Sequence, residues 1–401
     1  MTSLSPTIDK ARGMLPWVPA YCWQRLTRRS SRLKPVHLII GLADHFEPGI
    51  LPHVEGKLAE RALQEQRLER WCRDYPKVVA DWPDHDGRTF RHTYFYPAEQ
   101  YDKGLIDLLA QHCRDGWGEI EVHLHHGVET AGTPETTRQV LAGFRDALVG
   151  HGCLSQLDGI GGARYAFVHG NFALANSMQG RCCGVDSEIE ILAETGCYAD
   201  FTLPSSPNPA QTSKINALYE CQWPLSRKAA HREGRNLRSG RFSPMFPLMI
   251  QGPLLLDFSR RSRHWPLPTV ENGALTGTRP PTMGRLQLWK KAGIRVEGRP
   301  DWLFIKLHCH GMDPRDHEAM LGASLRRFLR ELKEGSRNGR EYQIHYVTAR
   351  EMANLVMAAC DGCEGNPNEY RDYRLELLRS RRPAMDSAVS GVREGLSSAV
   401  A

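Results

Sequence analysis

Long apolar runs are absent from this sequence of 401 residues. No stretch approaches the roughly 20 consecutive apolar residues that a helix needs to cross a bilayer. The short apolar patch between Met14 and Trp23 contains two prolines and is followed, not preceded, by its arginines, so it lacks the order of a signal peptide. We therefore expect a globular, cytoplasmic protein, and the hydrophobic and charged shares of 41% and 24% are ordinary for that class.

Several motifs that bind nucleotides or supply nucleophiles are also missing. The sequence has no P-loop and no Gly-x-Ser-x-Gly elbow, which argues against an NTPase and a serine hydrolase. The segment Gly159-Ile-Gly-Gly162 precedes an expected strand and not a helix, so it fails as a dinucleotide fingerprint. The net charge of +6 is modest and spread out, and no DNA- or RNA-reading motif is evident, so we expect no nucleic acid partner.

The cysteines do not form a recognisable framework. Their number, eleven, is odd, and they are scattered apart from Cys182-Cys183 and Cys360-x-x-Cys363. Disulfides are rare in a large chain of this kind, which predicts free thiols in a reducing compartment. A zinc site at Cys360 and Cys363 needs a second pair of ligands, and no other cysteine pair has the spacing.

Eight short runs of β-branched, aromatic or aliphatic residues, bounded by Gly, Pro, Asp or His, predict strands. They are Val36–Leu42, Thr89–Tyr96, Glu119–His125, Tyr165–His169, Tyr198–Leu203, Pro247–Phe258, Trp302–His308 and Tyr342–Thr348. Segments with helical period lie between most of them, among them Lys57–Tyr75, Pro134–Leu148 and Pro314–Lys333. This alternation predicts an α/β fold, and about eight repeats favour a distorted, TIM-like (β/α) barrel with seven or eight parallel strands.

An open doubly wound sheet is the alternative to a barrel. Such a sheet usually carries a glycine-rich turn between its first strand and the following helix. The first strand here ends in Ala43-Asp-His-Phe-Glu-Pro48, which contains no glycine. The sequence therefore favours the barrel, closed or nearly closed.

The chain divides into three expected regions. Residues 1–35 form a basic N-terminal arm that is either partly disordered or a helix on a membrane surface. Residues 36–365 form the barrel, with a basic insertion near 223–264 that is either a solvated loop or a binding surface for an anionic substrate group. Residues 366–401 form a C-terminal helix and a disordered tail.

Imidazole and carboxylate side chains gather where four of the expected strands end. These ends are Asp44-His45 with Glu47 close behind, His123 with His125 and His126, His169-Gly-Asn171, and His308-Cys-His310. Because the catalytic groups of such barrels lie at the carboxyl ends of the strands, the four ends predict one site at the barrel mouth.

The chemistry of these residues favours a metal. His123 and His125 share one face of a strand, and His126 lies just where that strand should stop. Converging neutral imidazoles are typical of zinc sites, and Asp44 with two or three histidines makes an N/N/O set that leaves positions open for water and substrate. A metal there would acidify water and polarise a carbonyl, and His308 or His310 could protonate the leaving group.

The same segments resemble the polysaccharide deacetylases of carbohydrate esterase family four, within the glycoside hydrolase/deacetylase barrel superfamily. Leu38–Pro48 resembles the first motif of that family, a strand that ends in two aspartates; Glu119–Gly127 resembles its metal-histidine motif; and Phe304–His308 resembles its last motif, a strand that ends in Leu-His. Further similarity lies in Phe167–Phe172 and Glu194–Asp200. The resemblance spans 36–350 as short islands, and it extends to an uncharacterised branch of the superfamily found with surface-polysaccharide genes.

The resemblance implies a metal-dependent deacetylase in which one aspartate is the base, a second aspartate and two histidines bind zinc, and a histidine is the acid. Two positions depart from this pattern. The aspartate pair is Asp44-His45, and the second histidine, expected four residues after His123, is Gly127. Either Asp44 binds the metal, or His45 takes the metal position and leaves Asp44 as the base.

We therefore predict a metal-dependent hydrolase that deacetylates a glycan or a glycan precursor, such as a lipid-linked sugar, in surface-polysaccharide (exopolysaccharide) metabolism. The predicted ligands of the divalent metal, Zn²⁺ in the first instance, are Asp44, His45, His123, His125 and His126. The predicted catalytic residues are Asp44, His308 and His310, and the predicted substrate contacts are His169 and Asn171. A peripheral contact with a membrane is expected through the N-terminal arm.

Two alternatives stay open. A glycoside hydrolase of the same superfamily would use two carboxylates without a metal, such as Asp44 with Glu47 or Asp200. A non-catalytic polysaccharide-assembly protein would keep the barrel and lose the chemistry, as the altered aspartate pair suggests. For single residues, Asn171 is alternatively a turn residue and Glu47 a structural cap.

Overall fold

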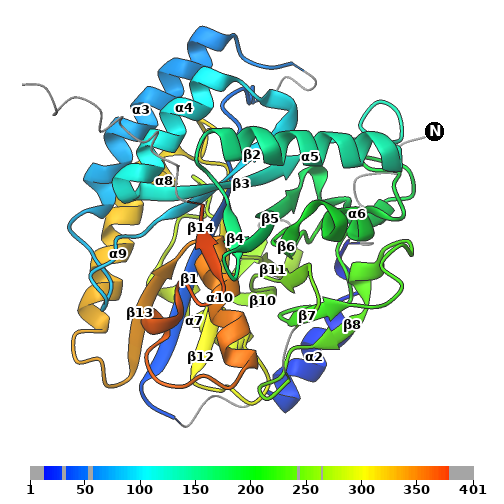
Figure 1. Ribbon diagram of the computed structural model, residues 1–401. Coiled ribbons are helices and arrows are strands. Elements are labelled where there is room, and N and C mark those ends of the chain that lie inside the picture. Colours follow the sequence, from blue (N-terminus) through cyan, green and yellow to red (C-terminus); the bar gives the residue numbers. More distant parts are fainter. Residues whose placement is uncertain (1–12, 29–32, 53–56, 242–243, 263–264, 379–401) are drawn as a thin grey trace, which may run out of the picture.

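A curved, mainly parallel sheet forms the centre of the protein (Figure 1). The computed structural model describes residues 13–28, 33–52, 57–241, 244–262 and 265–378. The parallel strands are β1 (Val36–His45), β2 (His92–Pro97), β3 (Gly118–Leu124), β5 (Ile160–His169), β6 (Cys197–Asp200), β9 (Leu248–Ile250), β12 (Trp302–Cys309) and β13 (Tyr342–Val347). They correspond to the eight predicted strands, and they confirm the predicted α/β class with its parallel strands.

The strand order departs from that of a regular barrel at β1. β12 pairs with one edge of β1 from His37 to Asp44. Along the other edge, β13 pairs with Val36–Gly41 and β2 pairs with Leu42–His45. The last parallel strand therefore pairs with the first half of the β1 edge whose second half pairs with β2, and it does not lie between β12 and β1, which makes the barrel distorted.

The barrel has a seam between β9 and β12. No backbone ladder joins these two strands in the part of the chain that the structure describes, because the sheet continues from β9 into the antiparallel strands β7 (Leu218–Cys221) and β8 (Gly234–Asn236). The chain after β9 nevertheless lies against β12: a Cβ at Gly252 would be 2.4 Å from the Lys306 carbonyl oxygen. Further along, the backbone N–H of Leu275 donates to the His308 carbonyl oxygen. The barrel is thus nearly closed.

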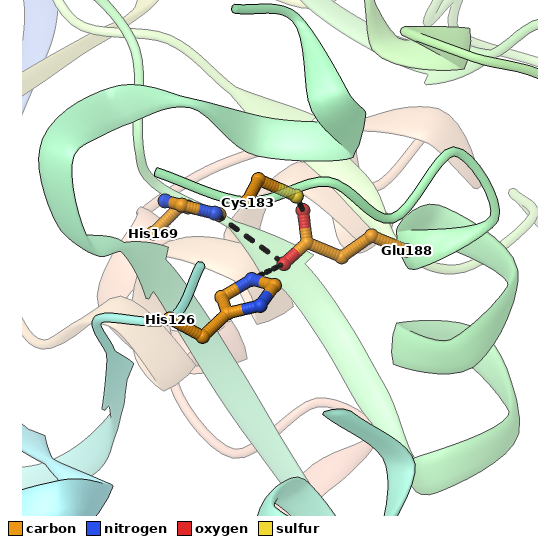
Figure 2. A group of neighbouring side chains, drawn as sticks. All are labelled: His126, His169, Cys183 and Glu188. Atoms are coloured by element: carbon orange, nitrogen blue, oxygen red, sulfur yellow. Dashed lines mark hydrogen bonds and ion pairs between the residues drawn. The ribbon is translucent and has the colours of Figure 1, made fainter. Parts of the chain in front are cut away.

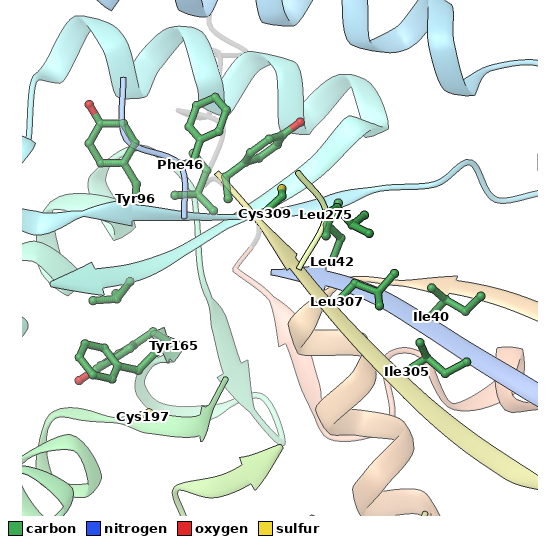
Figure 3. Packing of buried hydrophobic residues seen from close by; sticks show 14 of the residues in the cluster. Ile40, Leu42, Phe46, Tyr96, Tyr165, Cys197, Leu275, Ile305, Leu307 and Cys309 are labelled. Atoms are coloured by element: carbon green, nitrogen blue, oxygen red, sulfur yellow. The ribbon is translucent and has the colours of Figure 1, made fainter. Parts of the chain in front are cut away.

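The outer face of the sheet packs against a layer of helices. Alternate residues of neighbouring strands meet there, and Figure 3 shows Ile40 and Leu42 of β1 beside Ile305 and Leu307 of β12. The helices that complete this cluster are α3 (Arg61–Val79), α4 (Lys103–His112), α5 (Pro134–Gly150), α6 (Glu188–Thr195), α7 (Met283–Ala292), α8 (His317–Leu321) and α9 (Ala323–Gly335). The predicted helices correspond to α3, α5 and the pair α8–α9, which Gly322 separates.

The inner face of the sheet packs against a single buried helix, α10 (Ala349–Cys360). Thr348 and Glu351 form a capping box at its start, and all twelve of its residues are buried. Figure 1 shows α10, in orange, beside β1 and β13. The Met352 methyl group reaches Gly41, where a Cβ would be 2.7 Å away. Since Gly41 precedes His45 by four residues, α10 fills the lower interior and leaves the strand ends free to form a site.

The two chain ends add short elements. α2 (Val18–Thr27) packs Trp17 and Tyr21 into the inner cluster. Within 366–401, the described part forms a short 3-10 helix, Pro367–Tyr370, and strand β14 (Leu375–Leu377), which pairs with β4 (Ser155–Leu157). The predicted tail at 386–401 and residues 1–12 and 29–32 of the predicted arm lie outside the described residues, so the domain boundaries stay a prediction.

The sequence predicts neither a membrane-spanning helix nor a framework of disulfides. The described part of the chain includes no helix that is both long enough and apolar enough to span a bilayer. All eleven cysteines are free thiols, as the cysteine pattern predicts.

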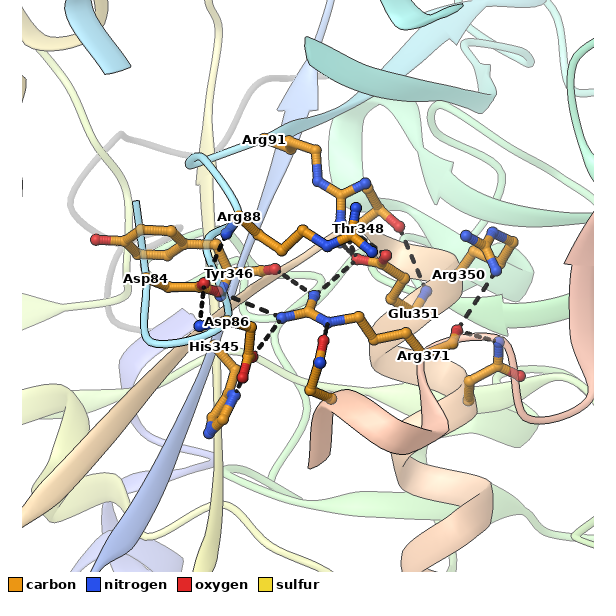
Figure 4. Close-up of polar contacts among 12 residues, drawn as sticks. Asp84, Asp86, Arg88, Arg91, His345, Tyr346, Thr348, Arg350, Glu351 and Arg371 are labelled. Carbon is orange, nitrogen blue, oxygen red and sulfur yellow. Dashed lines mark hydrogen bonds and ion pairs between the residues drawn. The ribbon is translucent and has the colours of Figure 1, made fainter. Parts of the chain in front are cut away.

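A buried network of charges lies where the end of β13, the start of α10 and the segment before β2 meet (Figure 4). Arg371 contacts Asp84 at 3.3 Å, Asp86 at 3.0 Å and Glu351 at 3.2 Å. Arg91 contacts the same Glu351 at 2.5 Å. The network joins the segment after α10 to the helix itself and to the loop before β2.

Candidate active site at the barrel mouth

The last two side chains of strand β1, Asp44 and His45, lie on opposite faces of the sheet. Leu38, Ile40 and Leu42 belong to the outer cluster, and Ile39 and Ala43 belong to the inner cluster. Because side chains alternate along a strand, Asp44 continues the outer series and His45 continues the inner series. The adjacent pair that the sequence presents as one motif is therefore divided between two environments.

Asp44 lies on the outer face and is fully buried. Its Oδ1 accepts a hydrogen bond of 2.7 Å from the Gly311 backbone N–H, and its Oδ2 lies 2.9 Å from His92 Nδ1. A Cβ at Gly311 would be 2.3 Å from Asp44 Oδ2, so only glycine fits this turn without a shift. Asp44 thus fixes the turn that follows β12 and carries His310. Asp44, His92 and Cys309 also form a candidate metal-ligand group of their own, on the outer face.

His45 faces the inner side at the mouth, among other histidines. Its ring centroid is 4.7 Å from that of His310, 4.9 Å from that of His123 and 6.4 Å from that of His308. Burial, and then the neighbouring histidines, hold the pKa of His45 well below its ordinary value. The ring is accordingly neutral and able to offer a nitrogen lone pair.

Glu47 connects the two sides of this group. Its Oε1 lies 3.5 Å from His123 Nε2 and 3.9 Å from His125 Nε2. Donor atoms of Glu47, His123 and His125 all lie within 4.8 Å of one another, and the same holds for Glu47, His45 and His310. Burial alone would raise the pKa of Glu47, but the close approach of His123 and the charges of the neighbouring histidines lower it to about 2. We call these five residues the barrel-mouth cluster.

His123 is oriented for binding through Nε2. Its Nδ1–H donates to the Val168 carbonyl oxygen of β5 at 2.7 Å, which leaves the lone pair on Nε2. Nε2 is buried, and no hydrogen-bond partner for it exists among the described residues. A backbone carbonyl on one ring nitrogen and an open lone pair on the other is the arrangement found in metal-binding histidines.

His125 is oriented in the same sense by a carboxylate. Its Nδ1 lies 2.6 Å from Glu99 Oε1, and its backbone N–H donates to Glu99 Oε2 at 3.3 Å. Burial acts to lower the pKa of His125, but Glu99 and Glu47 together raise it. Nε2 is left directed toward Glu47, so His123 and His125 present equivalent nitrogens to the same carboxylate.

His308 and His310 come from the end of β12. His308 is buried, and its Nδ1 lacks a hydrogen-bond partner within the described part of the chain. Burial, followed by the charges of Lys306 and His310, holds the pKa of His308 well below its ordinary value. His310 is half-buried and next to Glu47, which places it nearer to the opening than His308.

The remaining predicted site residues lie elsewhere. His126 and His169 gather with Cys183 and Glu188 in a separate group, and they are not brought to Glu47. Asn171 is exposed and has a φ of 55°, the left-handed conformation that asparagine tolerates in turns. The alternative interpretation of Asn171 as a turn residue fits this geometry.

Three residues of the site environment were not singled out from the sequence. Glu99 follows the end of β2, so the rule about strand ends could have found it. Cys183 and Glu188 lie in a loop and at a helix start, where no periodic pattern marks them. For Glu47, the sequence predicts only a second carboxylate beside Asp44 or a structural cap.

The fold and site together define the class: a distorted (β/α) barrel with candidate metal-binding groups at the carboxyl ends of its strands. No protein-family model matches the chain, and no curated protein is significantly similar to it. One similar solved structure is the crystal structure of a Mycobacterium smegmatis protein provisionally assigned as a polysaccharide deacetylase. It is 14% identical, covers 83% of this chain and 95% of its own, and has a TM-score of 0.43.

Proposed function

We propose that the protein is a metal-dependent hydrolase that removes an acetyl group from a glycan or glycan precursor. The observation that carries this proposal is the unpartnered, buried Nε2 of His123, which is directed at Glu47 beside the equivalent nitrogen of His125. Deacetylation and surface-polysaccharide metabolism come from the resemblance of the three strand-end motifs.

The residues present fit a divalent metal such as Zn²⁺. Two imidazole nitrogens and one carboxylate are the donor set of many catalytic zinc sites, in which a remaining position is left for water or substrate. In this proposal His123, His125 and Glu47 are the ligands, while Val168 and Glu99 orient the two rings from behind. A bound metal ion supplies a polarised acetyl carbonyl and an acidified water.

The histidines on the other side of Glu47 serve proton transfer. His310 is half-buried and lies nearest the opening, so we assign it the role of proton donor to the leaving group. The His45 ring packs against the His310 ring at a centroid distance of 4.7 Å and orients it, and His308 lies on the far side at 6.4 Å from His45. Asp44, instead of binding the metal, acts through the Gly311 turn and positions His310.

The geometry does not favour the glycoside hydrolase alternative. Asp44 and Glu47 would have to face one another across a substrate, but Asp44 is buried on the outer face, against His92. Asp200 is buried at the end of β6, where it accepts hydrogen bonds from the Thr202 hydroxyl and backbone N–H. A non-catalytic assembly protein is distinguished from a hydrolase by the metal and activity measurements described below.

Glu99→Gln tests the orientation of His125. The amide cannot hold His125 Nδ1–H as a carboxylate does, and loss of such a partner typically weakens metal binding by about 10- to 100-fold. We expect a rise of this size in the dissociation constant for Zn²⁺, measured by competition with a chromogenic chelator. Glu135→Gln, an exposed glutamate on α5, should leave zinc affinity unchanged. Equal affinities in wild type and Glu99→Gln would contradict this role.

We also propose that α2 contacts a membrane surface, where lipid-linked sugars are found. Trp23 is 68% exposed and Leu26 is 84% exposed, next to Arg25, while Trp17 anchors the helix in the protein. An amphipathic helix with basic residues and an exposed tryptophan is suited to an anionic bilayer surface.

Trp23→Ser should weaken binding to anionic phospholipid vesicles by about tenfold, because an indole ring no longer enters the interface. Co-sedimentation with the vesicles measures this binding. Trp223→Ser is the matched control, since Trp223 is also exposed, at 63%, and should bind as wild type does. If wild-type protein stays in the supernatant, the membrane contact is refuted and the hydrolase proposal is unaffected.

A further inference from the structure

A second group of metal-ligand side chains lies beside the barrel mouth and shares no residue with the barrel-mouth cluster. It consists of His126, His169, Cys183 and Glu188, which we call the loop cluster (Figure 2). One donor atom from each residue lies within 4.8 Å of the others. His169, Cys183 and Glu188 are fully buried, and the His126 side chain is 12% exposed.

Four different elements converge to form the loop cluster. His126 follows β3, His169 is the last residue of β5, Cys183 lies in the following loop and Glu188 begins α6. The loop after β3 is pressed against the loop of Cys183: Gly127 has a φ of 65°, and a Cβ there would be 2.1 Å from the Cys183 carbonyl oxygen. This close approach holds the thiol and the imidazole of His126 together.

Glu188 is the centre of the contacts. Its Oε1 lies 2.7 Å from His126 Nε2 and 3.5 Å from His169 Nε2. Its Oε2 lies 3.5 Å from Cys183 Sγ and accepts a hydrogen bond of 2.6 Å from the Ala175 backbone N–H. The Glu188 carboxylate therefore faces the other three residues.

His169 provides the observation that points to a ligand. Its Nδ1 contacts the Gly170 carbonyl oxygen, which places the proton on Nδ1 and the lone pair on Nε2. Nε2 is buried and directed into the loop cluster, 3.5 Å from Glu188 Oε1, and it makes no hydrogen bond among the described residues. A buried nitrogen left open in this way is costly unless something binds to it.

We propose that the loop cluster is a structural zinc site, in which Cys183, His126, His169 and Glu188 hold one Zn²⁺ ion tetrahedrally. A thiolate, two imidazoles and a carboxylate are all zinc ligands, and four protein ligands close the coordination shell, as in structural sites. Cys183 releases its proton to solvent when the ion binds. The neighbouring residues His125 and His126 then serve different ions, one at the barrel mouth and one here.

The role of this site follows from the elements it joins. The ion ties the loop after β3, the end of β5, the long loop that holds Cys183 and the start of α6 into one unit. That unit stands beside His123 and His125. Loss of the ion frees these segments, which form one side of the barrel mouth, although no ligand of the barrel-mouth cluster is removed.

Cobalt substitution tests this site, because a cobalt–thiolate bond gives a charge-transfer absorption band in the near ultraviolet. The barrel-mouth cluster contains no cysteine, but the group of Asp44, His92 and Cys309 does, so the band is assigned to Cys183 by its loss in Cys183→Ser. We expect the band when metal-free wild-type protein is titrated with Co²⁺. We expect it to be lost in Cys183→Ser and kept in Cys182→Ser, in which the thiol next along the chain is changed. Absence of the band in wild type, or its persistence in Cys183→Ser, overturns the proposal.

Zinc content separates this proposal from the proposed function. If both hold, elemental analysis finds two zinc ions per wild-type chain, one in Cys183→Ser and two in Cys182→Ser. If only the loop cluster binds zinc, wild type holds one ion and Cys183→Ser none. Wild-type content that is unchanged in Cys183→Ser and in His169→Ala overturns the loop-cluster site, whatever happens at the barrel mouth.

Discussion

His123→Ala is expected to abolish metal binding at the barrel mouth and to lower deacetylase activity by about a thousandfold. The alanine removes the buried Nε2 that faces Glu47 and leaves an incomplete donor set of His125 and Glu47. Lewis-acid stabilisation by a metal is worth several kcal/mol, and about 4 kcal/mol corresponds to a thousandfold in rate. Release of acetate from acetylated amino-sugar oligomers, together with elemental analysis, measures both effects.

Two comparison variants make this result specific. His151→Ala removes a histidine that contacts the half-exposed Asp107 and belongs to neither metal-ligand cluster, and it should keep both metal and activity. Asp44→Asn should keep the metal and lower kcat, because Asp44 holds the Gly311 turn and is not a ligand in this proposal. Loss of metal in Asp44→Asn would instead favour Asp44 as a ligand. Full metal content and activity in His123→Ala would refute the hydrolase proposal.

The strands were predictable because their signal is local. Each of the eight parallel strands is a short run of apolar or β-branched residues with clear boundaries, and such runs specify a strand without information from elsewhere in the chain. The parallel arrangement followed from the helical segments between them. The displaced position of β13 was not predictable, because it depends on how β1 divides its edge between two partners.

The rule that polar side chains gather at the strand ends predicted part of the barrel-mouth cluster; that this cluster is the active site stays a prediction. The rule identified His45, His123 and His310, which the structure brings together. It did not separate Asp44 from His45, because the sequence does not say that β1 continues through His45 and so keeps its alternation. His126 lies apart from the other predicted ligands for a related reason. Strand β3 ends at Leu124, and the chain turns at Gly127 toward Cys183.

The sequence of helix α10 indicates a buried helix, although it does not indicate what the helix packs against. Its sequence is apolar around most of its circumference, which is typical of a helix buried on all sides. Glu351 has a local role in the capping box with Thr348, but its contact with Arg91 and the contact of Arg350 with Glu119 at the start of β3 are long-range. Such pairs join residues more than 200 positions apart, so a single sequence does not reveal them.

Arg371→Ala is expected to destabilise the fold by about 3–5 kcal/mol, because it leaves buried carboxylates without their shared cation. The guanidinium contacts Asp84, Asp86 and Glu351, and it also donates to the Tyr346 carbonyl oxygen at 2.6 Å. Urea unfolding followed by tryptophan fluorescence measures the free energy of unfolding. Arg374→Ala is the matched control three residues away: its partly exposed ion pair with Asp158 should be worth about 0–1 kcal/mol.

The same network predicts how stability depends on pH. Burial acts to raise the pKa of Glu351, but Arg91 and Arg371 lower it to about 2 from an ordinary 4.5. A carboxyl whose folded pKa is depressed stabilises the protein above its unfolded pKa, and this contribution is lost as the pH falls through the folded value. Wild-type stability should therefore decline between about pH 4.5 and pH 2. The decline should be shallower in Arg371→Ala, where one of the cations that depress this pKa is gone, and parallel acid profiles of the two proteins would exclude this account of the network.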